Sequence, residues 1–236
     1  MKNNLLIIFL LLTFLAQGRE NELEVVTEDW PPFIVKGKEV SGVVTKNIKE
    51  ILANTDIKYS INIYPWARSL NLAKTTPNIL IYSILRTKQR EASFNWICPI
   101  YKSTAIHVYK LASNEINVNS LESIRKGVVG VMRGDHGYSF FVQAGFKEGI
   151  NLDLSSNEEI NLKKLISGRV DVVIQAKESL NYRLKSIGVK DLDIVPGLAI
   201  GESESVEHCM ALSLGTNPET IIKIRKAFKQ WQKDQK

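Results

Sequence analysis

Short apolar runs rich in β-branched residues alternate with helix-period patterns along most of this chain, and this alternation most constrains its fold. Such runs between turn signals are typical of buried strands, and apolar residues recurring every three or four positions are typical of amphipathic helices. The predicted class is therefore α/β. The expected strands are 23–27, 57–64, 79–84, 104–111, 128–132, 151–154, 170–174, 192–195 and 209–214. The expected helices are 44–52, 64–74, 121–126, 139–144, 156–167, 177–187 and 217–231, and 94–101 is expected as an apolar connector.

The first 18 residues have the pattern of a secretory signal peptide. Lys2 precedes an apolar block over 5–12 and 14–16, and small residues follow at Ala16 and Gly18. A charged start, a short apolar core and a small-x-small site are typical of a cleaved signal, and the block is short for a membrane span. We expect residues 1–18 to be removed and the mature chain to be periplasmic and soluble. The alternative is an uncleaved anchor.

The charge of the mature chain is mildly positive. The full sequence has a formal net charge of +6, and removing the signal peptide removes one lysine and no acid, which leaves +5. The positive residues are scattered, so they favour anionic solutes without forming the basic stripe of a nucleic-acid-binding protein. No nucleic-acid partner is expected.

The two cysteines, Cys98 and Cys209, lie far apart in the sequence. Export permits a disulfide, and two buried free thiols are the ordinary alternative. The chain has no CxxC motif and no Cys/His cluster, so neither a metal site nor a cofactor is expected.

The stretch 78–90 turns abruptly from apolar to basic. The run Ile79–Ile84 is followed by the polar sequence Arg-Thr-Lys-Gln-Arg over 86–90. Ligands usually bind at the carboxyl edge of an α/β sheet, and a guanidinium can bind a carboxylate or phosphate through two parallel hydrogen bonds. Arg86 and Arg90 share a face if the segment is helical. We interpret the stretch as a candidate anion site, and the alternative is a solvated loop.

Other expected strands and helices also begin or end with aromatic and polar side chains. These are Trp30, Phe33, Trp66, Arg68, Asp135 and His136. Paired prolines stiffen the turn of the first two, so that a ring there can stack on a ligand or cap the core. Trp66 and Arg68 lie in the first turn of a helix, where unpaired N–H groups favour an anion. The loop 133–138 lies between a strand and a helix, as in polar-ligand cradles.

Five motifs, in this order, resemble the family 3 periplasmic solute-binding proteins, which include the polar amino-acid-binding components of ABC transporters. They are Trp30-Pro-Pro-Phe33, Thr87-Lys-Gln-Arg90, Phe94–Tyr101, Val129–Gly134 and Gly168-Arg-Val-Asp171. The resemblance covers nearly all of the mature chain. It implies two α/β lobes joined by two crossing strands, with the ligand between them. Lobe 1 is expected at 19–101 plus 207–236, and lobe 2 is expected as the insert 102–206. Both cysteines would then lie near the crossings, where a disulfide bridge is conceivable.

The resemblance also implies roles for individual residues. Arg90 would bind a ligand carboxylate, Trp30 would pack on the ligand, and Ser83 and Thr87 would line the wall of lobe 1. Asp135 and His136 depart from the small polar donors of the amino-acid-binding relatives, and no acid stands near Ala176, where they have an amine-binding aspartate.

The Pro-Trp-x-Arg pattern at 65–68 and the Val-x-Arg-Gly-Asp pattern at 131–135 are more similar to a branch of the family with poorly defined ligands, in which three arginines would form a cationic wall of the cleft. Here these are Arg68, Arg86 and Arg90. The leading hypothesis is a monomeric, non-enzymatic binding protein that delivers a small anionic or zwitterionic solute to an ABC-type membrane permease. The alternatives are a cyclohexadienyl dehydratase-like enzyme using Asp135 and His136 as acid and base, and a solute-sensing module.

Overall fold

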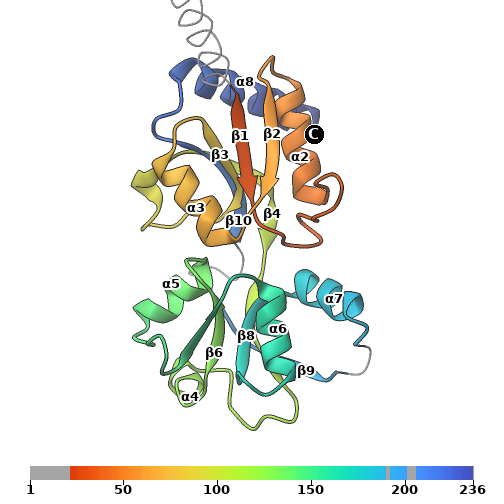
Figure 1. Ribbon diagram of the computed structural model, residues 1–236, viewed down its shortest axis with the longest axis vertical. Coiled ribbons are helices and arrows are strands. Elements are labelled where there is room, and N and C mark those ends of the chain that lie inside the picture. Colours follow the sequence, from red (N-terminus) through yellow and green to blue (C-terminus); the bar gives the residue numbers. More distant parts are fainter. Residues whose placement is uncertain (1–21, 190–191, 201–205, 236) are drawn as a thin grey trace, which may run out of the picture.

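The protein has two lobes, each built on one five-stranded sheet, as the computed structural model in Figure 1 shows. The structure describes residues 22–189, 192–200 and 206–235, so the predicted signal peptide lies outside the described residues. The strands are β1 (Leu23–Thr27), β2 (Tyr59–Ile63), β3 (Ile79–Ile84), β4 (Phe94–Thr104), β5 (Ile106–Leu111), β6 (Val129–Met132), β7 (Leu152–Ser155), β8 (Val172–Ala176), β9 (Ile194–Ala199) and β10 (Val206–Ser213). The helices are α2 (Val43–Ala53), α3 (Trp66–Thr75), α4 (Leu121–Ile124), α5 (His136–Gln143), α6 (Glu158–Ile166), α7 (Lys177–Ser186) and α8 (Pro218–Asp234), with a 3-10 turn at Glu91–Ser93.

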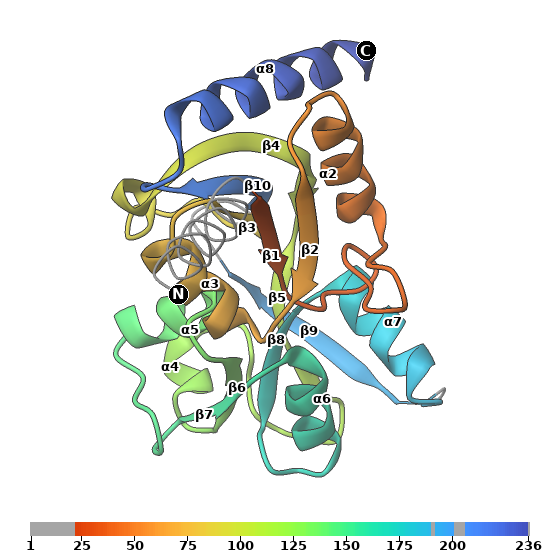
Figure 2. The same ribbon diagram turned by 45° about the horizontal axis from the view of Figure 1, so that its top comes forward.

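Lobe 1 contains the sheet β2-β1-β3-β10-β4. β1 lies between its parallel partners β2 and β3, while β10 is antiparallel to β3 and β4. Alternate residues of β1 enter different cores, since Val25 packs with α2 and α8 and Val26 packs with α3. Figure 2 shows α8 and α2 along the side of the sheet away from α3. β3 is buried along its whole length, which explains its continuous apolar sequence.

Lobe 2 repeats this arrangement with the sheet β7-β6-β8-β5-β9. β6 pairs in parallel with β7 and β8, and β5 is antiparallel to β8 and β9. Phe141 of α5 belongs to one apolar cluster, whereas Leu162 of α6 and Leu180 of α7 belong to another on the opposite face. The predicted α/β class and two-lobe fold are confirmed. None of the helices in the described ranges is long and apolar enough to cross a membrane.

Some predicted element boundaries differ from the structure. The expected connector 94–101 is part of β4, because this segment pairs with β10 along its length. The predicted lobe limits at 101/102 and 206/207 fall inside β4 and β10, and the first crossing between the lobes is at Ala105. Helix α6 is capped by Asn157, whose side chain accepts a hydrogen bond from Ile160 N, so the predicted start at residue 156 is one residue early.

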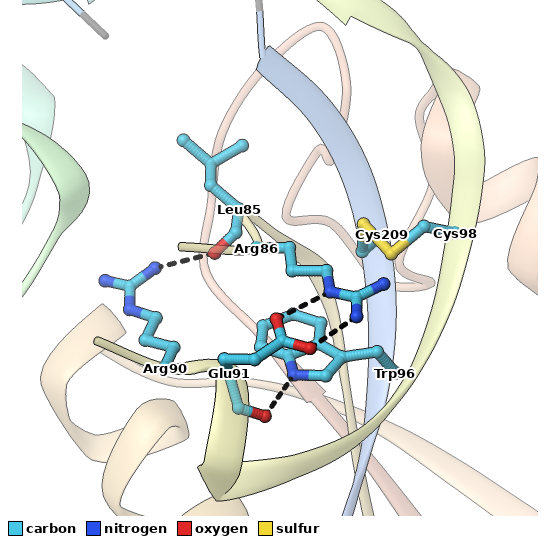
Figure 3. Close-up of a disulfide and its surroundings, with 7 residues drawn as sticks. All are labelled: Leu85, Arg86, Arg90, Glu91, Trp96, Cys98 and Cys209. Carbon is cyan, nitrogen blue, oxygen red and sulfur yellow. Dashed lines mark hydrogen bonds and ion pairs between the residues drawn. A yellow bond between two sulfur atoms is a disulfide. The ribbon is translucent and has the colours of Figure 1, made fainter. Parts of the chain in front are cut away.

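A disulfide joins the two strands that lead into the crossings. Cys98 of β4 and Cys209 of β10 are bonded, with their Cα atoms 4.6 Å apart (Figure 3). The two residues are 111 positions apart in sequence and become neighbours because β4 and β10 are antiparallel partners. The free-thiol alternative is therefore wrong.

Candidate functional site

A cavity lies between the lobes, at the carboxyl ends of their parallel strands. Its volume is about 40 Å³, well below the roughly 300–1,000 Å³ of ordinary ligand pockets, so a solute requires the lobes to part or side chains to move. The lining residues are Glu28, Trp30, Trp66, Ser83, Leu85, Arg90, Ile106, Met132, Asp135, His136, Gly137, Glu158 and Ile174. Six of these residues are among the ten predicted from the sequence, namely Trp30, Trp66, Ser83, Arg90, Asp135 and His136.

Arg90 is the basic side chain of the cavity lining. It follows β3 through a turn in which its N–H donates to the Thr87 carbonyl at 3.0 Å, and only 6% of the residue is exposed. Its guanidinium donates to the Gly134 carbonyl of lobe 2 at 2.9 Å and to the Leu85 carbonyl at 3.3 Å. Burial lowers the pKa of this guanidinium, which starts so high that the group stays charged. A buried, charged fork at the lobe interface is suited to a carboxylate.

Trp66 supports Arg90 at the same point of the interface. Its indole Nε1 donates to the Gly134 carbonyl at 3.0 Å, and the Arg90 guanidinium carbon lies 5.4 Å from the centre of its ring. One carbonyl of lobe 2 therefore accepts hydrogen bonds from two side chains of lobe 1. Both bonds must break when the lobes separate.

A buried histidine connects the cavity wall with the crossing strands. Ser83 has a positive φ of 59°, and its Oγ lies 2.6 Å from His208 Nδ1. The other ring nitrogen of His208 lies 2.9 Å from Thr104 Oγ1, at the end of β4. Burial lowers the pKa of His208 to about 4, so the ring is neutral at neutral pH. The indole of Trp30 stacks on this ring at 4.9 Å.

Three acidic groups line the cavity, and only one of them, Asp135, was predicted from the sequence. They are Glu28, which follows β1, Asp135 at the N-cap of α5, and Glu158 in the first turn of α6. Burial raises the pKa of Asp135 to about 7, against the hydrogen bond from Tyr138 N and the charge of Arg90. Burial and then the charges of Glu158 and Asp135 raise the pKa of Glu28 well above its usual value. Burial also raises the pKa of Glu158.

His136 lies beside Asp135 in the cavity. Burial, and then the charge of Arg90, lower its pKa, so the imidazole is neutral. Its Nε2 is buried and has no hydrogen-bond partner in the described part of the chain. A neutral ring with a free nitrogen is available for a hydrogen bond to a solute.

Arg183 of α7 joins the lobes at the rim of this acidic region. Its guanidinium is 3% exposed, donates to the Asp29 carbonyl of lobe 1 at 2.8 Å and lies 4.0 Å from the Asp29 carboxylate. The same group lies 3.4 Å from the Glu158 carboxylate, which also accepts a hydrogen bond from Ser179. Arg183 thus links the cavity wall of lobe 2 to the loop after β1.

Two of the predicted arginines point away from the cavity. The Arg86 guanidinium is paired with Glu91 on the exposed side of the loop, and Figure 3 shows it directed away from Arg90. Arg68 is exposed, with its guanidinium carbon 4.2 Å from the centre of the Tyr64 ring. The predicted wall of three arginines is therefore not formed, because each of these two has a local partner.

Phe33 and Thr87 are also absent from the cavity lining. Phe33 is 2% exposed and belongs to the core of lobe 1, where it packs against Trp30 and His208. The Thr87 hydroxyl is buried without a hydrogen-bond partner among the described residues. The rigid turn therefore presents Trp30 to the cavity and uses Phe33 for packing.

Comparison with solved structures identifies the architecture. An ancestral arginine-binding protein bound to arginine is 20% identical, with a TM-score of 0.76 over 91% of this chain and 94% of that one. A histidine kinase sensor domain similar to periplasmic binding proteins is 15% identical, with a TM-score of 0.78 over 92% of each chain. The chain has the fold of the periplasmic solute-binding proteins.

A third protein of this fold is an ancestral amino-acid-binding protein described as a precursor of cyclohexadienyl dehydratase. It is 18% identical, with a TM-score of 0.69 over 94% of each chain. No family model and no curated protein matches the sequence. The structural comparison therefore establishes the fold. Which solute can bind is decided by the residues that line the cavity.

Proposed function

We propose that this chain is an exported solute-binding protein that captures a small, polar, amino-acid-like solute between its lobes. Arg90 carries the proposal, because a buried guanidinium in an interlobe cavity can bind a carboxylate through two parallel hydrogen bonds. Of the anionic and zwitterionic solutes that the sequence suggests, a zwitterion fits better, since three carboxylic acids also line the cavity. A protein of the same fold binds arginine, which carries both charges.

Capture would proceed by rotation of the lobes about the two crossings. The solute would enter while the Gly134 carbonyl is separated from Arg90 and Trp66, and closure would restore these contacts around it. The limits predicted from the sequence are 19–101 plus 207–236 for lobe 1 and 102–206 for lobe 2; with whole strands assigned to one lobe, we propose 19–104 plus 206–236 for lobe 1 and 105–205 for lobe 2. A monomer, cleaved after residue 18 and located in the periplasm, would present its closed form to an ABC-type permease.

The test is thermal melting of the mature protein against a metabolite library. A solute that binds the folded state raises the melting temperature by mass action. Arg90→Ala and the milder Arg90→Lys are expected to abolish or strongly reduce the shift. Arg86→Ala is the matched control, because this arginine lies on the exposed side of the same loop. A full response from both Arg90 variants would show that the site is assigned wrongly.

An enzymatic role on the same fold is the second candidate. Asp135, whose pKa is raised to about 7, is adjacent to a neutral His136 with an unpaired nitrogen, and both line the cavity. A carboxyl group that titrates near neutral pH suits general acid–base catalysis. Turnover of prephenate or arogenate that is lost in Asp135→Asn would support an enzyme, and no turnover would leave the binding role.

A sensing role is the third candidate, since a histidine kinase sensor domain shares the fold. In that case the solute-bound form would contact a separate receptor instead of a permease. Genes for a permease and an ATPase beside the gene for this chain would favour transport, and a gene for a receptor would favour sensing.

A further inference from the structure

Helix α8 carries a large share of the positive charge of the protein. Its 17 residues include five basic and two acidic ones, which gives the helix a formal net charge of +3. The whole sequence has +6, or +5 without the lysine of the predicted signal peptide. The positive residues are therefore less scattered than expected from the sequence, and much of the excess lies on one helix. Figure 1 shows this helix at the end of lobe 1 that is away from lobe 2.

Four of the basic residues share the outward face of α8. Successive residues of a helix are rotated by about 100°, which places these four side chains within an arc of roughly 100°, along about 12 Å of the helix. They are all exposed, namely Arg225, Lys226, Lys229 and Lys233. The opposite side of the helix is buried against lobe 1 and is apolar, with Ile224, Ala227, Phe228 and Trp231. The four cations, which we call the α8 basic face, thus point directly away from the protein.

The protein itself does not neutralise the α8 basic face. None of its four side chains makes a hydrogen bond or an ion pair with any residue in the described ranges. The remaining cation of the helix, Lys223, lies to one side and is paired with Asp56 at 2.9 Å. The acids of the helix, Glu219 and Asp234, are at its two ends. Like charges three or four positions apart destabilise a helix, so the fold gains nothing from this arrangement.

The path of the chain favours a membrane as the partner of this face. Glu22, the first residue that the structure describes, lines the same surface depression as Thr220 and Lys223 of α8. The apolar block of the predicted signal peptide ends at residue 16, six positions before Glu22, so the chain enters lobe 1 beside α8. Ile222 is 64% exposed and lies within the same arc as the four cations. An apolar side chain among cations suits the headgroup region of a bilayer.

We propose that the α8 basic face is a docking surface for an anionic phospholipid bilayer, and that it holds the protein reversibly at the membrane. Each cation near such a surface raises binding about fivefold, so the four together are expected to raise it by about two to three orders of magnitude. The contact would be at the end of lobe 1 remote from lobe 2, which leaves the cavity between the lobes accessible. The proposal concerns where the protein resides and does not depend on which solute it captures.

Sedimentation of the mature protein with lipid vesicles tests the proposal. At about 0.05 M salt, binding to phosphatidylglycerol vesicles is expected to exceed binding to phosphatidylcholine vesicles at least about tenfold. At about 0.5 M salt the difference should disappear, because screening shortens the reach of the charges to a few ångströms. Equal binding to both lipids, or binding that persists at high salt, would overturn the proposal. No binding to either lipid would also overturn it and would leave an acidic protein as the occupant of this face.

A variant without the four charges tests the position of the docking surface. Glutamine keeps the helix propensity of lysine and arginine and removes the charge. Binding to phosphatidylglycerol is expected to fall at least about a hundredfold when all four residues of the α8 basic face are changed to glutamine. Circular dichroism checks that the variant is folded. Should it fail to fold, Lys226→Gln and Lys229→Gln, each expected to weaken binding about fivefold, provide the same test singly.

The matched control removes the same net charge elsewhere. It changes four exposed lysines outside α8 to glutamine, namely Lys36, Lys126, Lys147 and Lys185. This variant is expected to lose less than about threefold of its binding, because these lysines do not share one face with the α8 cations. An equal loss in both quadruple variants would show that only the total charge matters, and the docking surface would be wrong.

Discussion

Arg86 and Arg90 show how strongly the surroundings determine what a residue can do. Both follow β3, and they differ in sequence position by four residues. Arg86 is paired with Glu91 on the surface, where such pairs stabilise little, whereas Arg90 is buried at the lobe interface. The backbone turn between Thr87 and Arg90 separates the two side chains, so they do not share a face as a helix would require. Burial, rather than residue type, makes Arg90 the candidate for ligand binding.

Asp135 gives a prediction on pH at this scale. The folded protein holds the proton of Asp135 up to about pH 7, while an unfolded aspartate releases it near pH 4, so the folded state binds more protons between these values. Its contribution to the free energy of unfolding therefore falls as pH rises from about 4 to 7 and is constant above. Asp135→Asn keeps an N-cap residue and removes this loss. The variant should match the wild type near pH 4 and exceed it at pH 8, by up to about 4 kcal/mol.

Chemical denaturation of both proteins across this pH range provides the measurement. The opposing contribution of His208, whose pKa is lowered to about 4, is the same in both proteins and cancels, so the difference reports the titration of Asp135 together with its effect on the pKa of Glu28. A difference that does not change with pH would show that Asp135 titrates normally.

At the scale of elements, β4 and β10 are the two strands of lobe 1 at which the chain crosses between the lobes. They pair antiparallel, and the disulfide between Cys98 and Cys209 joins them covalently. The ring of His208 in β10 lies within hydrogen-bond distance of Thr104 at the end of β4 and of Ser83 in β3. A displacement of Ser83 in the cavity wall would therefore be transmitted to the crossing strands through this imidazole ring. Motion between the lobes is therefore expected beyond these strands, near Ala105.

Removal of the disulfide should destabilise the protein considerably. The bond closes a loop of 111 residues, and the loss of chain entropy on closing such a loop corresponds to roughly 4–5 kcal/mol in the entropic model. We expect the double variant Cys98→Ala/Cys209→Ala to lose about 2–5 kcal/mol of unfolding free energy in urea titrations. A loss below about 1 kcal/mol would indicate that the unfolded chain is already compact.

The elements of the fold were largely predictable from the sequence, and the composition of the site was not. A continuous apolar run located β3, which is buried along its whole length, and apolar periodicity located the helices, because both patterns are local properties of the sequence. Glu28 and Glu158 are 130 positions apart, and only the packing of two lobes places both in one cavity. The disulfide is another contact of this kind. The local sequence gives only weak signals for Glu28 and Glu158. Glu28 directly follows the first strand, and Glu158 lies in the first turn of a helix.

At the scale of the whole molecule, a small number of polar contacts hold the lobes together. The Gly134 carbonyl accepts from Arg90 and Trp66 on one side of the cavity, and Arg183 reaches Asp29 on the other. These bonds lie on either side of the acidic groups of the cavity. The bonds hold the lobes together, whereas repulsion between the acidic groups favours their separation. A solute that binds the closed form more tightly than the open form would shift this balance toward closure.

Arg183→Met tests this balance. The substitution keeps much of the side-chain volume and removes the hydrogen bond to Asp29, so the lobes should open on average. Small-angle X-ray scattering is expected to show a larger radius of gyration for the variant, and titration is expected to show weaker solute binding. Arg169→Met is the control, because Arg169 is paired with Asp153 inside lobe 2. An unchanged radius would mean that Arg183 does not hold the lobes closed.

The position of the disulfide also determines how the molecule would respond to a mechanical load. Lobe 2 lies within the segment enclosed by Cys98 and Cys209, so a force pulling on the two ends of the chain passes directly between the sulfur atoms. Lobe 2 then carries no tension while lobe 1 is stretched. A single oxidised molecule held at its termini should extend only by the length of lobe 1, and a reduced molecule should extend further by the whole of the insert. The bond therefore makes lobe 1 the tension-bearing part of the protein.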